Sequence, residues 1–309
     1  MVIKNKGLIS VIVPVFGNFD STRVEMCIDS IKSQKHTNAE IIVVEQTKEP
    51  RLNEVRDISY QHIPIAFSED GFFVPGNVRN YAAKMAVGEF LYNTDGDILF
   101  FKDNYLAELV KLLGGDSHTC LYQPQMRRLP IENFEEFRKR CQEGGLQNAL
   151  FALNISQPYS ATYDTCPVRI RYFKKMISGQ EEISVASETD HQKYLSGANK
   201  GKEPFFYTLN FHAGGILMSR NQFDAVGGYC EDYAGWGCHD EDIQWKLGSL
   251  FNLQRIPKEK GLEVLHLDHP RPYFSEVRWN KNREIQKDRM GAGVGSAIIS
   301  DQRRQNGTR

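Results

Sequence analysis

Three short apolar runs constrain the fold of this 309-residue chain more than any other feature. They span residues 8–15, 41–44 and 90–92, and the first two are rich in β-branched residues, as in strands buried on both faces. Residues 20–34 and 77–87 lie between them and carry apolar side chains at helical spacing. The alternation of strand and helix is typical of a parallel sheet with crossover helices. We therefore expect an α/β fold with a Rossmann-like, mostly parallel central sheet flanked by helices.

Each apolar run ends in polar or turn-forming residues. These ends are Phe16-Gly17-Asn18, Glu45-Gln46-Thr47 and Asp95-Gly96-Asp97. Ligands of parallel sheets bind beyond the carboxyl ends of the strands, so we expect the three segments to converge on one site. No GxGxxG follows the first run, which argues against a dinucleotide cofactor.

Composition and charge indicate an ordinary globular protein. The net charge of -1 gives no electrostatic argument for nucleic acid as a partner. The six cysteines form no CxxC pair, and we expect free thiols in a reducing compartment. The apolar run of residues 8–16 contains Pro14 and is too short for a signal peptide or a membrane span. A cytoplasmic location follows as an expectation, and peripheral docking at the inner face of a membrane stays open.

The chain is expected to divide into four segments. Residues 1–114 form a first half that contains the three apolar runs, and residues 205–288 form a second half. Between them, residues 115–204 are an inserted helical and loop region, in which Gln180 to Lys202 suit a mobile lid or a solvated loop equally well. Residues 289–309 are expected to be a flexible tail.

Asp95-Gly96-Asp97 places two carboxylates at the end of a predicted strand. Mg²⁺ or Mn²⁺ is commonly held by one or two carboxylates together with phosphate oxygens of the substrate. An Asp-Gly turn in a hairpin would explain the same residues without any ligand. The motif alone therefore does not distinguish a metal site from a turn, and the other motifs of the chain must decide between them.

A second group of polar residues follows two glycines and a tryptophan. It runs Gly235-Trp236-Gly237-Cys238-His239-Asp240-Glu241-Asp242, at the start of a predicted helix. Acidic residues in a first helical turn are favoured by the helix dipole alone. The dipole does not explain the two glycines and the indole, which suit a sugar-binding loop beside a general base. Further along, His266-Leu267-Asp268-His269 supplies two imidazoles, which are common ligands of divalent metals.

Together these motifs resemble a known family of enzymes. The stretches 9–16 and 42–46, with Arg79-Asn80 and Asp95-Gly96-Asp97, resemble the donor half of GT-A fold glycosyltransferases of the family 2 type. Residues 214–223, Gly227-Gly228-Tyr229 and the Gly-Trp-Gly stretch with its acidic run are similar to the acceptor half of β-1,4-galactosyltransferases and chondroitin-synthase-type enzymes.

The resemblance implies a role for each matching residue. Donor binding is implied for Pro14, Val15, Phe16, Glu45, Gln46, Arg79 and Asp95. Metal binding is implied for Asp97, His269 and His266, with Mn²⁺ or Mg²⁺ as the cofactor. Acceptor or sugar binding is implied for Trp236, Gly237, His239 and Glu241, and the role of catalytic base for Asp240. The chain departs from the galactosyltransferase pattern at Cys238-His239, where that pattern has Gly-Glu, so the identity of the sugar stays open.

The expected activity is metal-dependent, inverting transfer of a hexose or N-acetylhexosamine (Gal, GalNAc or GlcNAc). The donor is a UDP-sugar, and the acceptor is a hydroxyl of a saccharide or glycolipid, as in the synthesis of bacterial surface glycans. Three alternatives stay open: a retaining enzyme of the polypeptide N-acetylgalactosaminyltransferase type, a sugar nucleotidyltransferase, and an inactive saccharide-binding module. The nucleotidyltransferase would need a glycine-rich basic loop after the first strand, and Val15-Phe16-Gly17-Asn18 is not one.

Overall fold

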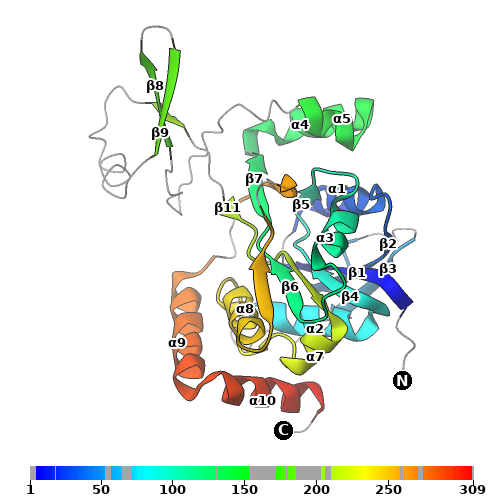
Figure 1. The fold of residues 1–309 in the computed structure, drawn as a ribbon, viewed down its shortest axis with the longest axis vertical. Helices are drawn as coiled ribbons and strands as arrows, with labels where there is room; N and C mark the ends of the chain where they lie inside the picture. The colour runs from blue at the N-terminus through cyan, green and yellow to red at the C-terminus, as the bar shows by residue number, and fades with distance from the viewer. Residues whose placement is uncertain are drawn as a thin grey trace. The chain divides into compact units, whose positions relative to one another are not determined.

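The computed structural model in Figure 1 divides the chain into two compact units. Unit 1 comprises residues 1–125, 211–264 and 271–309, and unit 2 comprises residues 126–210 and 265–270. The structure describes residues 5–17, 19–52, 57–64, 71–129, 131–152, 172–177, 180–185, 203–205, 210–257, 260–270 and 274–307.

Unit 1 is built on a seven-stranded sheet with the strand order β13-β6-β12-β4-β1-β2-β3. In chain order its strands are β1 (Asn5–Phe16), β2 (Asn38–Thr47), β3 (Ser59–Pro64), β4 (Gly88–Asn93), β6 (Thr119–Tyr122), β12 (Ile216–Ser219) and β13 (Asn252–Arg255). Only β12 runs antiparallel to its neighbours β4 and β6, and the other four pairs are parallel. The predicted fold class, a mostly parallel sheet flanked by helices, is confirmed.

Strand β1 lies between β4 and β2, and it pairs with β2 from Leu8 to Phe16 and with β4 only as far as Ile12. Pro14 therefore lies beyond the last residue paired to β4, where a missing N–H group costs no ladder hydrogen bond on that side. The strand continues to Phe16 rather than ending at the proline, and it brings Pro14, Val15 and Phe16 to the carboxyl edge of the sheet.

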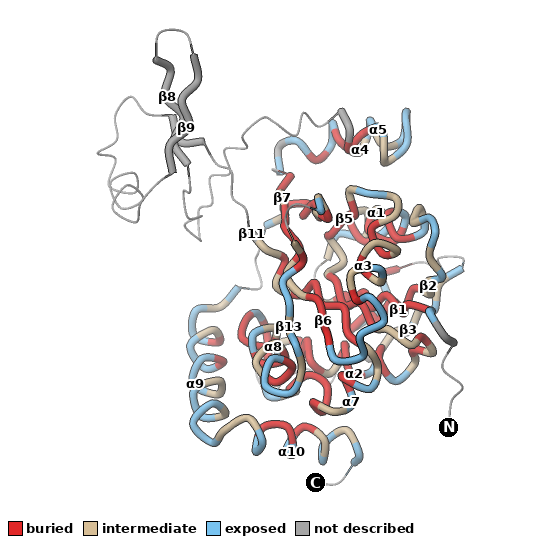
Figure 2. Tube along the Cα trace, in the orientation of Figure 1, coloured by how far each residue is buried: buried red, intermediate tan, exposed pale blue. Residues whose placement is uncertain are grey.

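Helices cover both faces of this sheet, and the strands between them are buried (Figure 2). One face packs against α2 (Pro75–Met85), α7 (Arg220–Ala225) and α8 (His239–Leu250). Residues such as Ile12, Leu91 and Met218 meet Val78 and Ile243 there in one apolar cluster. On the opposite face, Tyr92 contacts Phe100 and Tyr105, and the hydroxyls of Tyr92 and Tyr105 are hydrogen-bonded at 2.9 Å.

The helices expected near residues 20–34 and 77–87 are present as α1 (Ser21–Lys32) and α2, and a further helix, α3, spans Tyr105–Leu113. The short strand β5 (Ile98–Phe100) precedes α3. The run at residues 90–92 lies in β4, which is the fourth strand in sequence because the edge strand β3 precedes it. The sequence SYQHIP of β3 lacks the apolar run that marks a strand buried on both faces.

Unit 2 contains most of the expected insertion, but not its beginning. Strand β6 belongs to the central sheet of unit 1, so the division expected at residue 115 is wrong by about ten residues. The elements that lie within unit 2 or enter it are β7 (Gln125–Leu129), a 3₁₀ turn (Ile131–Asn133), α4 (Phe134–Gly144), α5 (Leu146–Ala152), β8 (Tyr172–Ile177), β9 (Gln180–Val185), β10 (Glu203–Phe205), β11 (Asn210–Phe211) and β14 (Glu263–Leu267). Strands β10, β8 and β9 form a small antiparallel sheet. The lid expected at residues 180–202 begins as β9, and residues 186–202 lie outside the described residues.

Within the described residues, no helix combines the length and the apolar character needed to cross a membrane. The five cysteines in this part of the chain are all free, and Cys166 lies outside it.

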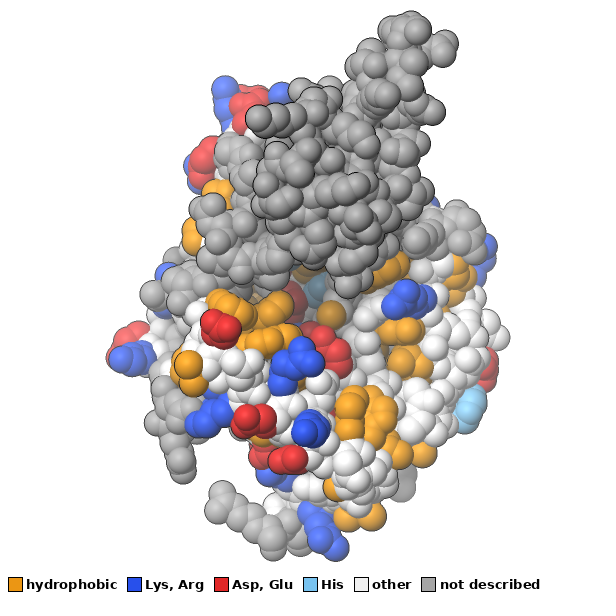
Figure 3. Space-filling view, turned by 90° about the vertical axis from the view of Figure 1, so that its left-hand side faces the viewer, with side chains coloured by type: hydrophobic (Ala, Val, Ile, Leu, Met, Phe, Trp, Pro, Cys, Tyr) orange, Lys and Arg blue, Asp and Glu red, His pale blue; other side chains and the backbone are white. Residues whose placement is uncertain are grey.

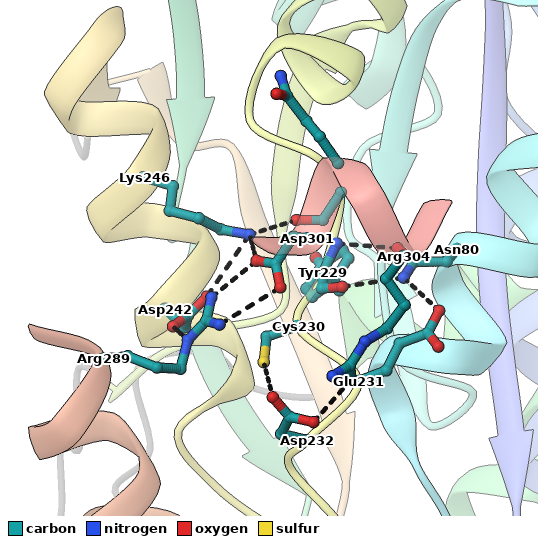
Figure 4. Close-up of polar contacts among 12 residues, drawn as sticks. Asn80, Tyr229, Cys230, Glu231, Asp232, Asp242, Lys246, Arg289, Asp301 and Arg304 are labelled. Atoms are coloured by element: carbon teal, nitrogen blue, oxygen red, sulfur yellow. Dashed lines mark hydrogen bonds and ion pairs between the residues drawn. The ribbon is translucent and has the colours of Figure 1, made fainter. Parts of the chain in front are cut away.

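The expectation of a flexible tail at residues 289–309 is wrong. The chain forms α9 (Glu276–Ala292) and, directly after it, α10 (Val294–Gln305). Both helices are fastened to α8 by a buried network of two acidic and two basic side chains (Figure 4). These are Asp242 and Lys246 of α8, Arg289 of α9 and Asp301 of α10.

The charged groups of these four side chains lie close together. Lys246 Nζ lies 2.5 Å from Asp301 Oδ2 and 3.6 Å from Asp242 Oδ2, and it also donates to the carbonyl of Gly228 at 2.6 Å. The Arg289 guanidinium donates to both oxygens of Asp242 and both oxygens of Asp301. Two positive and two negative groups therefore neutralise one another where water is excluded, and loss of one member leaves an unbalanced buried charge. The C-terminal helices α9 and α10 thereby hold α8 in place.

We predict that Asp301→Ala destabilises unit 1 by about 3 kcal/mol, because Lys246 and Arg289 lose a buried partner. The measurement is the free energy of unfolding in urea, with Asp288→Ala as the matched control. Asp288 is an exposed acidic residue of α9, and its loss is expected to change the free energy by less than about 0.5 kcal/mol. A loss below about 1 kcal/mol for Asp301→Ala would show that the network does not hold the helices.

Candidate active site

The Asp95-Gly96-Asp97 turn packs against the end of β1 in unit 1. The Thr94 amide donates to the Ile12 carbonyl at 3.1 Å and so carries the β1–β4 pairing up to the turn. A Cβ atom on Gly96 would lie 3.2 Å from Val24 and 3.6 Å from Val15, so a larger residue would crowd this turn. The glycine therefore allows the two carboxylates to lie directly beside the end of the central strand.

Arg79 of α2 is the centre of the site, and its side chain is only 1% exposed. Its NH2 group donates to Asp95 Oδ1 at 2.8 Å and lies 3.9 Å from Asp240 Oδ1. The guanidinium also lies over the ring of Tyr229, at 5.2 Å from the ring centroid. One buried cation thus joins a carboxylate at the end of β4 to a carboxylate in the first turn of α8.

Two histidines contact the same pair of carboxylates. His212 Nδ1 lies 3.7 Å from Asp95 Oδ2, and His239 Nε2 lies 3.4 Å from Asp240 Oδ2. His239 was predicted as a site residue, whereas His212 was not. The sequence alone does not mark His212; in the structure it lies just before Gly214, where a Cβ would lie 3.3 Å from Arg79 and 3.4 Å from Asp95.

The charges around Asp240 favour its ionised form. Burial raises the pKa of the Asp240 carboxyl, but the nearby His239, Arg79 and His212 outweigh burial and hold this pKa below its usual value. Burial likewise lowers the pKa of Arg79, and the carboxylates of Asp240 and Asp95 reverse that shift. The positive end of α8 also favours an anion in its first turn. Asp240 is therefore a carboxylate at neutral pH, able to accept a proton.

The Gly-Trp-Gly loop before α8 is held in a conformation that its glycines permit. Gly237 has φ +101°, and a Cβ there would lie 2.0 Å from the Trp279 ring. Cys238 also has a positive φ, +68°, which few non-glycine residues adopt. The glycine of the galactosyltransferase pattern thus corresponds to a left-handed position that a cysteine occupies in this chain. Asn282 of α9 secures the loop, since its Nδ2 donates to the carbonyls of Ala234, Trp236 and Gly237.

Asn80 ties α2 to the loop that leads to α8. Its Nδ2 donates to the Tyr229 carbonyl and to Glu231, both at 2.9 Å, and its Oδ1 accepts from the Tyr229 amide at 2.8 Å. The two segments lie so close that a Cβ on Gly76 would be 2.2 Å from the Cys230 carbonyl oxygen. These contacts between α2 and the loop therefore fix the positions of Arg79 and Asn80.

The residues predicted to bind the nucleoside lie at the ends of β1 and β2. Phe16 stacks on Phe73 with ring centroids 4.3 Å apart, and Gln46 Oε1 accepts from the Val74 amide at 3.2 Å. Glu45 is fully buried, and both of its carboxylate oxygens accept hydrogen bonds from within the protein. The donors are Thr47 and Tyr60 hydroxyls at 2.6 Å each and the amides of Arg51 at 2.8 Å and Leu52 at 3.1 Å. This pattern gives Glu45 a structural role in holding the segment after β2.

The predicted metal ligands are distributed over both units. Asp97 lies in unit 1, and His266 and His269 lie in unit 2, where their rings stack with centroids 5.7 Å apart. His266 Nδ1 donates to Asp268 at 2.7 Å, and Asp268 also pairs with Arg128 at 2.5 Å. His269 Nδ1 donates to the Pro270 carbonyl at 2.8 Å. In a neutral imidazole these bonds keep the proton on Nδ1 and leave the lone pair on Nε2. This nitrogen can then bind a metal.

Comparison with known proteins identifies the family. The model of glycosyl transferase family 2 matches residues 10–176, which is more than half of the chain. The chain therefore belongs to glycosyl transferase family 2, and the predicted class of enzyme, a glycosyltransferase, is confirmed. A second family model, described as the N-terminal domain of galactosyltransferase, matches residues 195–270. The two matches follow one another in the order of the predicted resemblance, and the family 2 match extends to residue 176, into the expected insertion.

Three individual proteins that match this chain are at most 29% identical to it. An uncharacterized glycosyltransferase of Rickettsia conorii is 26% identical over 170 residues, which are 53% of this chain and 25% of the relative. Another from Rickettsia felis is 29% identical over 104 residues, or 33% of this chain and 16% of the relative. The matches thus span a quarter or less of these relatives. Among solved structures, a mannosyltransferase from Pyrobaculum calidifontis in complex with GDP-Man and Mn²⁺ is 14% identical, with a TM-score of 0.48 over 96% of this chain and 69% of its own.

We predict that Glu45→Gln lowers stability at neutral pH and that the loss shrinks in acid. Burial raises the pKa of Glu45, but its hydrogen bonds outweigh burial and leave the pKa below the usual 4.5. The carboxylate therefore stabilises the fold above pH 4.5, and this contribution disappears as the pH falls through the folded-state pKa. Urea unfolding of the variant and the unaltered chain between pH 3 and 7 measures the difference, with the exposed Glu49→Gln as control. A difference that does not change with pH would contradict this role of Glu45.

Proposed function

We propose that the chain transfers a hexose or N-acetylhexosamine (Gal, GalNAc or GlcNAc) from a UDP-sugar to a hydroxyl of a saccharide acceptor, with inversion and with the aid of a divalent cation. Synthesis of a bacterial surface glycan is the setting that suits this activity. Membership of glycosyl transferase family 2 supports the reaction class. The observation that carries the proposal is the buried Arg79 between Asp95 and Asp240.

Arg79 is suited to the diphosphate of the donor. Its guanidinium is buried, and Nε and NH1 have no hydrogen-bond partner among the described residues. Buried guanidinium groups generally complete their hydrogen bonds, and a phosphate accepts from the planar fork with two oxygens. Asp95, which is 39% exposed, then faces the ribose or the sugar of the donor. Pro14, Val15, Phe16 and Gln46 are the proposed nucleoside contacts at the edge of the sheet.

Asp240 is the proposed general base. A new bond forms between the acceptor oxygen and the anomeric carbon on the face opposite the leaving group, and the bond from that carbon to the diphosphate breaks. The acceptor hydroxyl transfers its proton to the Asp240 carboxylate as the new bond forms. Arg79 stabilises the negative charge that develops on the diphosphate. Trp236, Gly237, His239 and Glu241 are the proposed contacts of the sugars around this centre.

The proposed ligands of the cation are Asp97, His269 and His266. A carboxylate and two neutral imidazoles with oriented rings suit Mn²⁺, and Mg²⁺ would rely on the carboxylate and phosphate oxygens. When bound, the cation neutralises charge on the leaving diphosphate. The hydrogen bonds of the histidine Nδ1 atoms in unit 2 support the fit, because such bonds orient metal-ligating imidazoles.

We predict that Asp240→Asn lowers the transfer rate by at least about 100-fold, because the amide cannot accept the proton. Affinity for UDP is expected to change less than about threefold. Transfer is measured as formation of the glycosylated product, whose anomeric proton coupling in NMR reports inversion, and UDP affinity is measured by calorimetry. Asp224→Asn on α7, away from these contacts, is the matched control. Turnover near that of the unaltered chain would remove Asp240 from the role of base.

Chelation is predicted to stop transfer, and Mn²⁺ is predicted to restore it. With Asp97→Asn, His266→Ala or His269→Ala, Mn²⁺ binding should weaken by at least about tenfold, in line with the loss of one ligand. Electron paramagnetic resonance of Mn²⁺ measures binding without any need for activity. His118→Ala, at a histidine of the α3–β6 connection, serves as the control. Full activity in EDTA, or Mn²⁺ binding that none of the three variants weakens, would contradict the metal proposal.

A further inference from the structure

An aromatic cluster on unit 1 extends beyond the Gly-Trp-Gly loop. Trp236 and Trp279 stack with centroids 5.2 Å apart and planes 29° apart, and Phe274 meets Trp236 edge-on at 5.8 Å. Trp236 is 39% exposed and Phe274 is 40% exposed. Figure 3, which views the molecule from the side where α9 lies in Figure 1, shows hydrophobic side chains gathered among acidic and basic ones on this face.

The cluster is fixed in place before any ligand binds. Trp279 belongs to α9 and packs against the backbone of Gly237, where no side chain could fit. Asn282, one turn further along α9, donates to the carbonyls of Trp236 and Gly237. The Arg283 guanidinium lies 5.9 Å from the centroid of the Trp279 ring. The rings are therefore held rigidly together, and Arg283 adds a charged donor over the Trp279 ring.

The sequence places this cluster close to the proposed catalytic base. Trp236 is four residues before Asp240, and the intervening segment is held by the contact between the Gly237 carbonyl and His239 Nδ1 at 3.3 Å. Sugar rings present C–H faces that stack on flat aromatic side chains, and their hydroxyls bond to groups at the rim. One sugar placed against Asp240 and Trp236 leaves Trp279 and Phe274 for a neighbouring sugar.

We infer that Trp279 and Phe274 form a second saccharide subsite, so that the acceptor is an oligosaccharide of at least two sugar units. This inference rests on the proposed glycosyl transfer and narrows its acceptor class. A monosaccharide acceptor would fill only the part of the surface next to Asp240. A longer chain would also cover Trp279 of α9 and Phe274, which lies just before this helix.

Direct binding of saccharides tests the subsite. The chain has three tryptophans, and two of them belong to the cluster, so a Trp245→Phe background makes intrinsic fluorescence report on this pair. With UDP and Mn²⁺ present, the probes are the methyl β-glycosides of galactose, glucose and N-acetylglucosamine and the β-1,4-linked disaccharides lactose, cellobiose and diacetylchitobiose. We expect at least one disaccharide to bind at least about tenfold more tightly than every methyl glycoside.

Variants of Phe274 and Trp279 test whether these two residues cause the tighter binding of the disaccharide. Phe274→Ala and Trp279→Leu should each weaken disaccharide binding by about tenfold. Since Trp279 also packs on Gly237, the exposed Phe274 provides the variant with the smaller structural effect. Tyr81→Ala is the matched control, because Tyr81 of α2 is an aromatic residue with the same 39% exposure as Trp236. Disaccharide affinity should not change in this control.

Several results would overturn the subsite. They are equal affinity for mono- and disaccharides, no binding of any probe, and disaccharide binding that neither variant weakens. Release of UDP from UDP-sugars by the unaltered chain separates this failure from that of the proposed function. A chain that hydrolyses donors but shows one of these results refutes the subsite alone, and a chain that hydrolyses none refutes both.

Discussion

The arrangement of the candidate site in unit 1 depends on one buried cation, the guanidinium of Arg79. A buried arginine is stable only beside carboxylates, and its two partners come from segments nearly 150 residues apart in sequence. Asp95 follows the strand beside β1, and Asp240 begins the helix after the Gly-Trp-Gly loop. Folding therefore brings the proposed donor-binding residue Asp95 and the proposed catalytic base Asp240 to the same side chain. The close packing of Gly76 on the Cys230 carbonyl allows α2 to hold that position.

The position of Asp240 depends in turn on the C-terminal helices. Asp242 lies in the same first turn of α8, and its carboxylate is bound by Arg289 of α9 rather than by a substrate. The acidic run thus has different tasks at neighbouring positions: Asp240 faces Arg79, and Asp242 anchors the helix. Asp301 of α10 completes the network. This division of roles explains why the end of the chain is ordered although its composition is polar.

The sequence was sufficient for the central sheet and for the ends of its strands, because buried parallel strands read as continuous apolar runs. It was insufficient for β3, which is an edge strand, and for α10, whose order comes from ion pairs with residues far away in sequence. The same limit applies to the site. Arg79, Asp95 and Asp240 were predictable as members of motifs, whereas His212 and the structural role of Glu45 depend on contacts that only the folded chain creates.

The most direct test of the account is the activity of Arg79→Lys. Lysine keeps the charge but not the planar fork that reaches two carboxylates and, as proposed, the diphosphate of the donor. Transfer from UDP-sugars with Mn²⁺ should fall by about 100-fold or more in kcat/KM, with weaker binding of UDP, while the variant remains folded by circular dichroism. A folded Arg79→Lys chain with activity within about threefold of the unaltered chain would contradict the central role of this residue.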